Sequence, residues 1–302
     1  MRLAVRLPNW VGDACMALPA LQALTERGVT LQLFGKGWAG DLFAAHGWPV
    51  TKLPAGVRPA AAVLRATGIQ RGLLFTNSFG SALQWRLAGV RAVGYRREFR
   101  TLLLGRGVPR AAGGHEVEAF WRLAQEVATW LALPPLPAQP PARLGLQLTD
   151  GHRQAADEAL RRVGVHSSFV VLCPLAAGTI NGQSKVWPGF GLLSRLIQER
   201  GLPVVACPGP GEEAACAAAL PGARLLPGLA LGAYAAVCAR ALITVANDSG
   251  PMHLAAAVDA PVVGVFGVGD PTRTRPWSPH GRVVGDAHNW PTAMTVMQVL
   301  EL

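Results

Sequence analysis

The chain has 302 residues, of which 50% are hydrophobic and 15% charged, and this length allows two domains that each bury a core. Its formal charge is +10, from 28 basic and 18 acidic residues, and only three of the basic residues are lysines. This excess favours acidic partners such as phosphates or anionic lipid head groups. No helix-turn-helix, zinc or RNA-binding signature accompanies it, so we expect no nucleic-acid partner.

The first half of the chain alternates short apolar runs with amphipathic segments. We expect strands at residues 3–7, 31–34, 72–76 and 92–95, a helix from Ala14 through Leu24 that ends before Gly28, and a long helix over 115–131. The proline-rich stretch that follows is typical of an interdomain linker. The predicted organisation is a domain at 1–132, a linker at 133–143 and a second domain at 144–302.

The second half repeats this alternation. We expect strands at 169–173, 203–207, 241–246 and 262–266, a polar loop that reaches Pro188, and helices that end at Arg200, cover 212–220 and 231–240, begin near Pro251 and follow Thr292 as N-cap. Strands that alternate with helices indicate an α/β fold with parallel sheets. We therefore predict two Rossmann-like domains that face a central cleft, with ligands beyond the carboxyl ends of the strands.

Cysteine usage and the start of the chain favour a cytoplasmic protein. The five cysteines are widely separated and mostly set in apolar runs, without a C-x-x-C pair, so we expect buried free thiols and no metal site. The N-terminus is basic and then apolar, but polar residues and a proline between positions 6 and 13 interrupt that run. No apolar stretch reaches the roughly 18 residues of a membrane span.

Residues 247–253 read NDSGPMH and join the apolar run 241–246 to the apolar run 254–258. This pattern predicts a strand, a tight turn and a helix, with Pro251 suited to a first helical position. The start of such a helix offers free N–H groups and the positive end of a dipole. We therefore expect this turn to bind an anion, most often a phosphate or a diphosphate.

Together with this turn, four other segments carry a family resemblance. They are residues 8–13 (PNWVGD), 77–83 (NSFGSAL), 88–96 (AGVRAVGYR) and 185–188 (KVWP). In this order they resemble glycosyltransferase family 9, and within it the ADP-heptose:lipopolysaccharide heptosyltransferases, particularly the second-heptose type. The resemblance implies a GT-B fold whose N-terminal domain holds the acceptor and whose C-terminal domain holds the nucleotide-sugar.

The same resemblance implies an inverting transfer of a heptose, or a related sugar, from an ADP-sugar to a hydroxyl of an anionic glycolipid or lipopolysaccharide core. It implies no metal or other cofactor. The positive charge agrees with a cytoplasmic enzyme that meets its glycolipid acceptor at the inner face of the membrane. Two alternatives stay open, a nucleotide-sugar epimerase of the same fold and a non-catalytic nucleotide-sugar-binding protein.

The resemblance also assigns roles to residues. The implied catalytic residues are Asp13, as general base, and Lys185, on the diphosphate. The candidate donor-binding residues are Thr179, Glu212 (or Glu213), Asp248, Ser249, Gly250 and His253. The candidate acceptor-binding residues are Trp10, Gly12, Asn77, Ser78, Arg96 and Arg97. A carboxylate can take the proton of an acceptor hydroxyl, while a lysine and a helix N-terminus stabilise the departing ADP.

Each assignment has an ordinary structural alternative. Asp13 and Asp248 can be helix caps, with Asn247 or Ser249 sharing the second cap. His253 can be a packed histidine on an apolar helix, and Lys185 a solvated loop residue. The arginines at 96, 97 and 100 can grip acceptor phosphates or form a solvated basic face, and most of the tryptophans are expected in the core.

Overall fold

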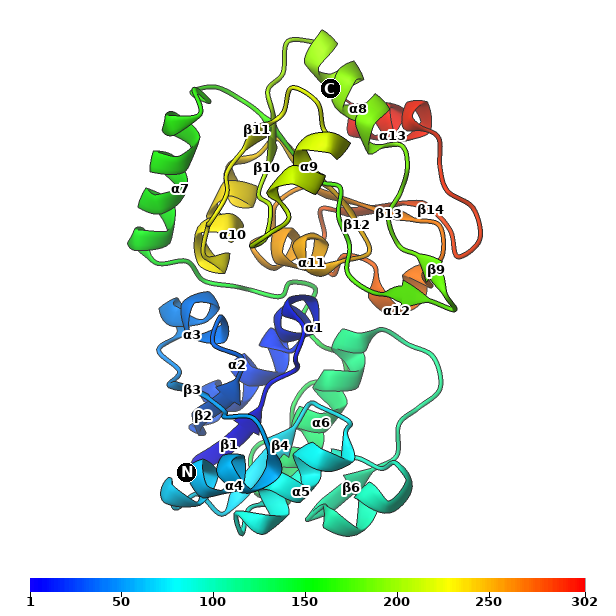
Figure 1. Cartoon of the computed structure of the whole chain (residues 1–302). Helices are drawn as coiled ribbons and strands as arrows, with labels where there is room; N and C mark the ends of the chain where they lie inside the picture. The colour runs from blue at the N-terminus through cyan, green and yellow to red at the C-terminus, as the bar shows by residue number, and fades with distance from the viewer. Residues whose placement is uncertain (302) are drawn as a thin grey trace. The chain divides into compact units, whose positions relative to one another are not determined.

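The computed structural model describes residues 1–301 and divides into two units, Met1–Pro141 and Ala142–Leu302. Each unit contains a six-stranded parallel sheet with helices on its faces. In Figure 1 the N-terminal unit runs from blue to teal and the C-terminal unit from green to red. The predicted α/β class, with a parallel sheet in each half, is confirmed.

The N-terminal sheet is doubly wound. Its strands are β1 (Arg2–Arg6), β2 (Thr30–Gly35), β3 (Val50–Lys52), β4 (Arg71–Leu74), β5 (Arg91–Tyr95) and β6 (Arg106–Val108). They lie in the order β3-β2-β1-β4-β5-β6, so the winding reverses between β1 and β4. Leu3, Ala4 and Val5 on β1 are fully buried, as expected of a central strand covered on both faces. The reversal point is where such sheets bind ligands, beyond the carboxyl ends of the strands.

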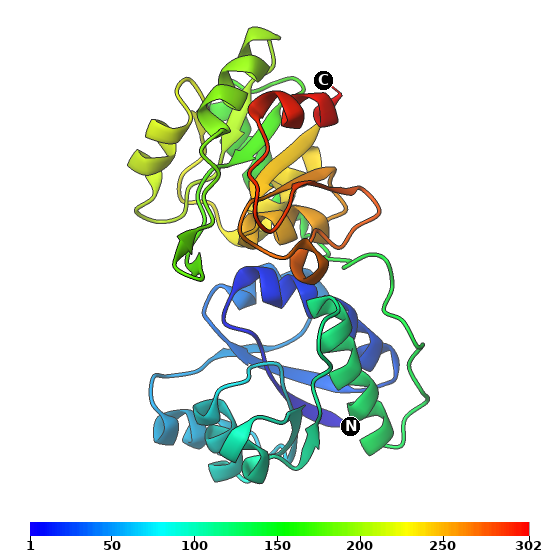
Figure 2. The ribbon, with the colours of Figure 1, turned by 90° about the vertical axis from the view of Figure 1, so that its right-hand side faces the viewer.

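The helices of this unit form two groups. They are α1 (Val11–Met16), α2 (Leu18–Glu26), α3 (Ala39–Leu42), η1 (Ala44–His46), α4 (Val57–Ala66), α5 (Phe79–Leu87), η2 (Glu98–Leu103) and α6 (Glu116–Trp130), where η denotes a 3₁₀ helix. α2 packs against α6, and α4 against α5. Figure 2 shows these two pairs on opposite sides of the sheet. Right-handed crossovers on either side of the reversal point require this arrangement.

The single helix predicted from Ala14 through Leu24 is wrong in one respect, because the chain forms two helices with a break at Ala17. Pro19 lies in the first turn of α2 and has no N–H to bond the preceding turn, so the first helix ends before it. The strands β3 and β6 were not predicted. Each has three residues and lies at an edge of the sheet, where apolar patterning is weakest.

The C-terminal sheet repeats the same winding. Its strands are β7 (Val170–Cys173), β10 (Val204–Ala206), β11 (Arg224–Leu225), β12 (Ile243–Asn247), β13 (Val262–Phe266) and β14 (Gly281–Gly285), in the order β11-β10-β7-β12-β13-β14. A separate antiparallel hairpin joins β8 (Thr179–Ile180) to β9 (Gln183–Ser184). The reversal point of this sheet lies between β7 and β12.

The helices of the C-terminal unit also follow the predicted alternation. They are α7 (Asp150–Arg162), α8 (Phe190–Glu199), α9 (Glu213–Ala219), α10 (Leu231–Arg240), α11 (Gly250–Ala257), α12 (Pro271–Thr274) and α13 (Ala293–Leu300). The helix predicted at 231–240 is confirmed at both ends, and Thr292 caps α13 by accepting a hydrogen bond from Thr295 N at 3.1 Å. α7 was not predicted, because its exposed face is highly polar and only a narrow apolar stripe packs on α10.

Candidate donor and acceptor sites

An ion pair marks the start of α11, beyond the carboxyl end of β12. The Lys185 ammonium lies 3.2 Å from Asp248 Oδ2, and the two side chains are 18% and 11% exposed. The carboxylate therefore holds the lysine beside the helix start while leaving part of it open to solvent. A cation in this place, next to the positive end of a helix dipole, suits a diphosphate.

The first turn of α11 carries no side-chain cap. Its N-cap residue is Ser249, whose hydroxyl donates to the Asn247 carbonyl at 3.2 Å and makes no capping bond. The helix begins at Gly250 with Pro251 in its first turn, close to the predicted start. The interpretation of residues 247–249 as caps is wrong, since none of these side chains caps the helix. The first-turn N–H groups are consequently not satisfied by a cap of the protein.

Asn247 was predicted only as a possible cap, yet it organises the loop that carries Lys185. Its buried side chain accepts a hydrogen bond from Trp187 N at 2.9 Å and donates to Pro174 O at 2.9 Å. One side chain thus joins both ends of the segment between β7 and α8. A polar residue at the end of an otherwise apolar strand was the sequence signal for this role.

Gly269 is a second residue whose role at this site the sequence pattern did not indicate. A Cβ at this position would lie 2.9 Å from Asp248 Oδ2, so a side chain there would push on the carboxylate of the ion pair. Its φ is ordinary, and space rather than backbone conformation is what requires glycine.

The segment predicted as a long polar loop contains the β8–β9 hairpin. Asn181 and Gly182 form its turn, with φ of 50° and 78°, and an Asn-Gly pair with two positive φ angles is the preferred two-residue hairpin turn. Thr179, a candidate donor-binding residue, is exposed on β8 and pairs with Ser184, the residue before Lys185. The hairpin therefore leads directly into Lys185. Its strand pairing places Thr179 opposite Ser184, one residue before the lysine.

A small cavity of about 30 Å³ lies beyond β7 and β10. The residues that line it include Cys173, Pro174, Leu175, Glu212, Tyr234 and Pro251. Glu212 Oε2 accepts a hydrogen bond from Gly209 N at 2.9 Å, which fixes the carboxylate at the exposed rim, whereas Glu213 lies in the first turn of α9. Cys173 Sγ lies 3.0 Å from the Tyr234 hydroxyl, and burial raises the pKa of this thiol to about 12. The floor of the cavity is therefore neutral and largely apolar.

His253 lies on α11 between Met252 and Leu254 and is only 4% exposed. This position agrees with the packed-histidine alternative more closely than with direct contact to a ligand.

Asp13 lies in the first turn of α1, beyond the carboxyl end of β1. The N-cap of α1 is Trp10, so the interpretation of Asp13 as the N-cap residue is wrong. Asp13 is half-buried, and its negative charge adds to burial in raising the pKa of the Cys15 thiol to about 12. Trp10 is 65% exposed, whereas Gly12 is buried.

Arg6 stabilises the turn before α1 and was missed as a positioning residue. Its guanidinium donates to Asn9 Oδ1 at 2.7 Å and to Leu7 O at 2.8 Å. Burial lowers the pKa of Arg6 from its ordinary value. The turn that presents Trp10 and Asp13 is thus tied to the end of β1.

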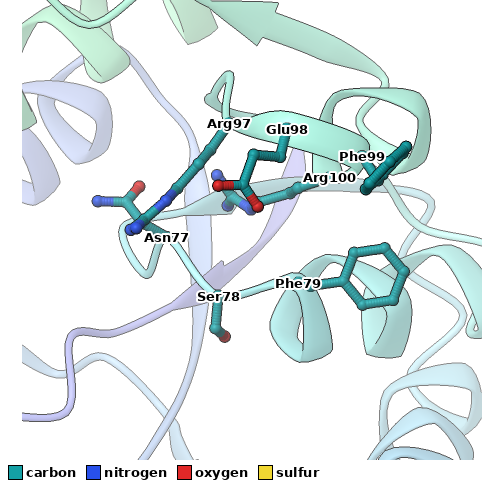
Figure 3. Close-up of a pocket in the computed structure, with 7 residues that line it drawn as sticks. All are labelled: Asn77, Ser78, Phe79, Arg97, Glu98, Phe99 and Arg100. Atoms are coloured by element: carbon teal, nitrogen blue, oxygen red, sulfur yellow. The ribbon is translucent and has the colours of Figure 1, made fainter.

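A larger cavity of about 500 Å³, here called the α5–η2 pocket, lies beyond β4 and β5. It is lined by Asn77, Ser78, Phe79, Arg97, Glu98, Phe99 and Arg100. Figure 3 shows the rings of Phe79 and Phe99 at one side of the pocket and Asn77 with Arg97 at the other. Asn77 Oδ1 is buried and accepts no hydrogen bond from any residue between 1 and 301. The pocket therefore combines an unsatisfied acceptor, an arginine and two aromatic rings.

The other candidate acceptor-binding residues differ in their exposure and in whether their side chains already bond within the protein. Ser78 is the N-cap of α5, and its hydroxyl accepts from Ser81 N at 3.2 Å. Arg96 is exposed outside the pocket, where its Nε donates to Gly107 O at 2.8 Å. Arg97 is exposed and lines the pocket.

The expectation that all three arginines grip a ligand or form a solvated face is wrong for Arg100. It is 2% exposed and donates to Tyr95 O and, at 2.6 Å, to Thr76 O, which ties the ends of β5 and β4 together. Burial lowers its pKa to about 10.

Within residues 1–301, no cluster of three or more His, Cys, Asp and Glu side chains has the arrangement of a metal site. None of the helices in this part of the chain has the length and hydrophobicity needed to span a bilayer.

Two parallel Rossmann-like units, with a cation beside the start of a helix in the second, are the architecture of GT-B enzymes that act on nucleotide-sugars. The profile of glycosyltransferase family 9 (heptosyltransferase) matches residues 59–301, about four-fifths of the chain. The chain therefore belongs to glycosyltransferase family 9.

Relatives span nearly the whole chain. Over 318 residues it is 27% identical to lipopolysaccharide heptosyltransferase 2 of Salmonella typhimurium, which covers 94% of this chain and 88% of that protein. The Escherichia coli protein of the same name is 26% identical over 316 residues, with the same coverage. These matches favour sugar transfer over the epimerase and the non-catalytic alternatives.

Two solved structures share the fold of this chain over its whole length. The E. coli ADP-heptose lps heptosyltransferase II superposes with a TM-score of 0.79 at 26% identity and covers 100% of this chain and 97% of that chain. The E. coli heptosyltransferase WaaC with ADP gives a TM-score of 0.74 at 23% identity, covers 100% and 99%, and supports the fold.

Proposed function

We propose that this glycosyltransferase moves a heptose from an ADP-linked donor to a hydroxyl of an inner lipopolysaccharide core. The observation that carries the proposal is the match, over 94% of the chain, to proteins named lipopolysaccharide heptosyltransferase 2. The ion pair at the start of α11 supports a donor that bears a diphosphate, because a lysine and uncapped N–H groups suit that charge. The cavity rimmed by Glu212 supports a nucleoside at its mouth, since a carboxylate can accept hydrogen bonds from ribose hydroxyls.

The proposed reaction is a single displacement with inversion. The acceptor hydroxyl gives its proton to the Asp13 carboxylate as its oxygen bonds to the anomeric carbon. The bond from that carbon to the phosphate oxygen breaks, and its electron pair leaves with ADP. Lys185 and the start of α11 stabilise the charge that gathers on ADP. No second carboxylate is required, because no covalent sugar intermediate forms.

The other candidates take supporting roles in this proposal. Asp248 orients Lys185 and lies beside the donor sugar, while Ser249 and Gly250 offer backbone N–H groups. Thr179 and His253 border this donor site. On the acceptor side, Asn77 and Arg97 bind polar or anionic groups of the glycolipid, and Trp10 and Gly12 shape the turn that presents Asp13. Ser78 caps the helix that borders the pocket, and Arg96 adds positive charge outside the pocket.

The proposal needs no metal ion and no cofactor, and it places the enzyme in the cytoplasm at the inner face of the membrane. A chelator should accordingly leave the rate of transfer unchanged.

Thermal unfolding with ADP-, UDP- and GDP-linked sugars, side by side, tests the donor. A ligand at about one hundred times its Kd stabilises the folded state by about 2.7 kcal/mol. We expect such stabilisation from ADP-heptose and little from UDP- or GDP-sugars. A preference for UDP compounds would overturn the proposed donor, and hydrolysis or epimerisation of the donor without an acceptor would overturn the proposed reaction.

A further inference from the structure

The net positive charge of the chain lies almost entirely in the N-terminal unit. Residues 1–141 contain 16 basic and seven acidic residues, a net charge of +9, whereas residues 142–302 contain 12 basic and 11 acidic residues, a net charge of +1. Between Asp41 and Glu116 the one acidic residue is Glu98. The half of the unit that carries α4, α5 and η2 is therefore the most basic part of the protein.

Two large apolar side chains project from η2 in this basic region. Phe99 is 77% exposed and Leu102 is 81% exposed, more than any other large apolar side chain between residues 1 and 301. Side chains three residues apart in a 3₁₀ helix lie directly above one another, so these two share one face of η2. Arg100, on another side of η2, is buried and bonded to the ends of β4 and β5. The helix is thus anchored through Arg100 while it exposes an apolar face.

The apolar face continues onto α5 and is bordered by cations. Phe79 of α5 is 50% exposed and lines the α5–η2 pocket together with Phe99. α5 and η2 pack against each other, and both rings lie on the same side of the pocket in Figure 3. Arg96 and Arg97 immediately precede η2 and are exposed. We call Phe79, Phe99, Leu102 and these two arginines the η2 surface.

We propose that the η2 surface docks the enzyme on an anionic lipid bilayer, with Phe99 and Leu102 inserted at the level of the head groups. Aromatic and aliphatic tips bordered by arginines are what an anionic membrane interface binds, because insertion and charge attraction add. The net charge of +9 selects an anionic partner, and an anionic bilayer combines that charge with an apolar layer that can take up the two exposed tips. The inference rests on the proposed function, since an acceptor held in a membrane must be reached from its surface.

Flotation with lipid vesicles tests the proposal without donor or acceptor. We compare vesicles of phosphatidylglycerol and phosphatidylethanolamine with vesicles of phosphatidylcholine alone, using the wild type, Leu102→Glu and Phe99→Ser. Met294→Glu is the matched control, because Met294 is 56% exposed on α13 of the nearly neutral C-terminal unit. We expect binding to the anionic vesicles that weakens with added salt, and about tenfold weaker binding for each of the two η2 variants but not for the control.

Equal vesicle binding by Leu102→Glu and the wild type would overturn the proposal, as would binding that appears only when the vesicles contain the acceptor glycolipid. A second measurement uses a deacylated, water-soluble acceptor. Leu102 does not line the α5–η2 pocket, so Leu102→Glu should keep its transfer rate on this acceptor and lose it on acceptor embedded in vesicles. Vesicle binding as expected, with no transfer to either acceptor, would overturn the proposed function and leave the docking surface intact.

Discussion

The two units share one winding of six parallel strands but differ in charge and in how far their side chains are fixed. In the C-terminal unit, net charge +1, the Asn247 side chain bonds both ends of the segment between β7 and α8, and Asp248 pairs with Lys185, so these candidate groups are held in place. In the N-terminal unit, net charge +9, Trp10 and Arg97 are exposed and Asn77 Oδ1 is unsatisfied. One scaffold thus carries a fixed cation beside a helix start and, separately, an open basic surface.

This difference matches what each unit is proposed to bind. A nucleotide diphosphate is small and always has the same charge, so a fixed cation and a fixed helix start recognise it at little entropic cost. A core glycolipid is large and variable, and exposed arginines and aromatic rings can bind it in more than one pose. Substitutions confined to one unit at a time should therefore separate the two kinds of binding.

The largest of these effects is expected from Lys185→Ala in the C-terminal unit. Loss of the cation beside the leaving group should lower kcat by about 10²–10³. Lys52→Ala is the control, because Lys52 is an exposed lysine on β3 of the other unit. ADP release under saturating substrates measures the rate, and a thermal melt checks folding. A loss below about threefold would exclude Lys185 from stabilisation of the leaving group.

Asn247→Asp should weaken donor binding by about tenfold or more. A carboxylate at this position cannot donate to Pro174 O and would face that carbonyl with negative charge, which releases the segment that carries Lys185. Calorimetric titration with ADP measures the change, and Asn247→Ala should weaken binding in the same direction. Gln154→Glu, an equivalent change on the exposed face of α7, should bind ADP as the wild type does. Unchanged ADP affinity in both Asn247 variants would show that the loop holds its shape without this side chain.

Arg97→Ser should affect the acceptor alone. Removal of one charge-assisted hydrogen bond at a solvent-exposed pocket should raise the acceptor KM by about tenfold, with the donor KM unchanged. Arg86→Ser removes the same charge from α5, where Arg86 is exposed and outside the pocket. If both variants raise the acceptor KM equally, general attraction by net charge explains the effect and the pocket does not.

The smallest effect concerns the stability of the N-terminal unit in acid. Burial lowers the pKa of His46 from 6.5 to about 4, and its ring stacks on Trp48 with centroids 4.4 Å apart. As the pH falls, the unfolded chain therefore takes up a proton on His46 before the folded chain does. The contribution of the neutral His46 ring to the free energy of unfolding is complete above pH 6.5 and is lost as the pH falls toward 4. For a partly exposed ring we expect a loss of about 1–2 kcal/mol.

Denaturant unfolding between pH 7 and pH 4 measures this loss. His46→Phe keeps a ring for stacking and should lose this part of the pH dependence, whereas His280→Phe, at an exposed site in the other unit, should keep it. Identical pH profiles for the wild type and His46→Phe would contradict the assignment.

The sequence was sufficient for the features that follow local rules. The strand, turn and helix at 247–253, the helix at 231–240 and the Thr292 cap depend on apolar periodicity and neighbouring residues, and the structure contains all three. The Asn181-Gly182 hairpin was within reach of the same rules but was overlooked as part of a polar loop.

Other features depend on contacts between distant parts of the chain, which local patterns do not encode. The role of Asn247 requires Pro174 and Trp187 to meet at one side chain. In the sequence Arg100 is not distinguishable from a surface arginine. Its role depends on the pairing of β4 with β5, which brings the carbonyl groups that it bonds close together. The exposure of Phe99 and Leu102 likewise depends on which side of η2 faces the sheet.

We assign the base to the N-terminal unit and the leaving-group site to the C-terminal unit. Single-turnover transfer by Asp13→Asn, measured together with donor affinity by calorimetry, tests this assignment most directly, with Asp41→Asn in the same unit as control. We predict that transfer falls by about 10²–10⁴ while ADP-heptose binds with an unchanged Kd. Transfer within about threefold of the wild type, or loss of donor binding, would contradict the account.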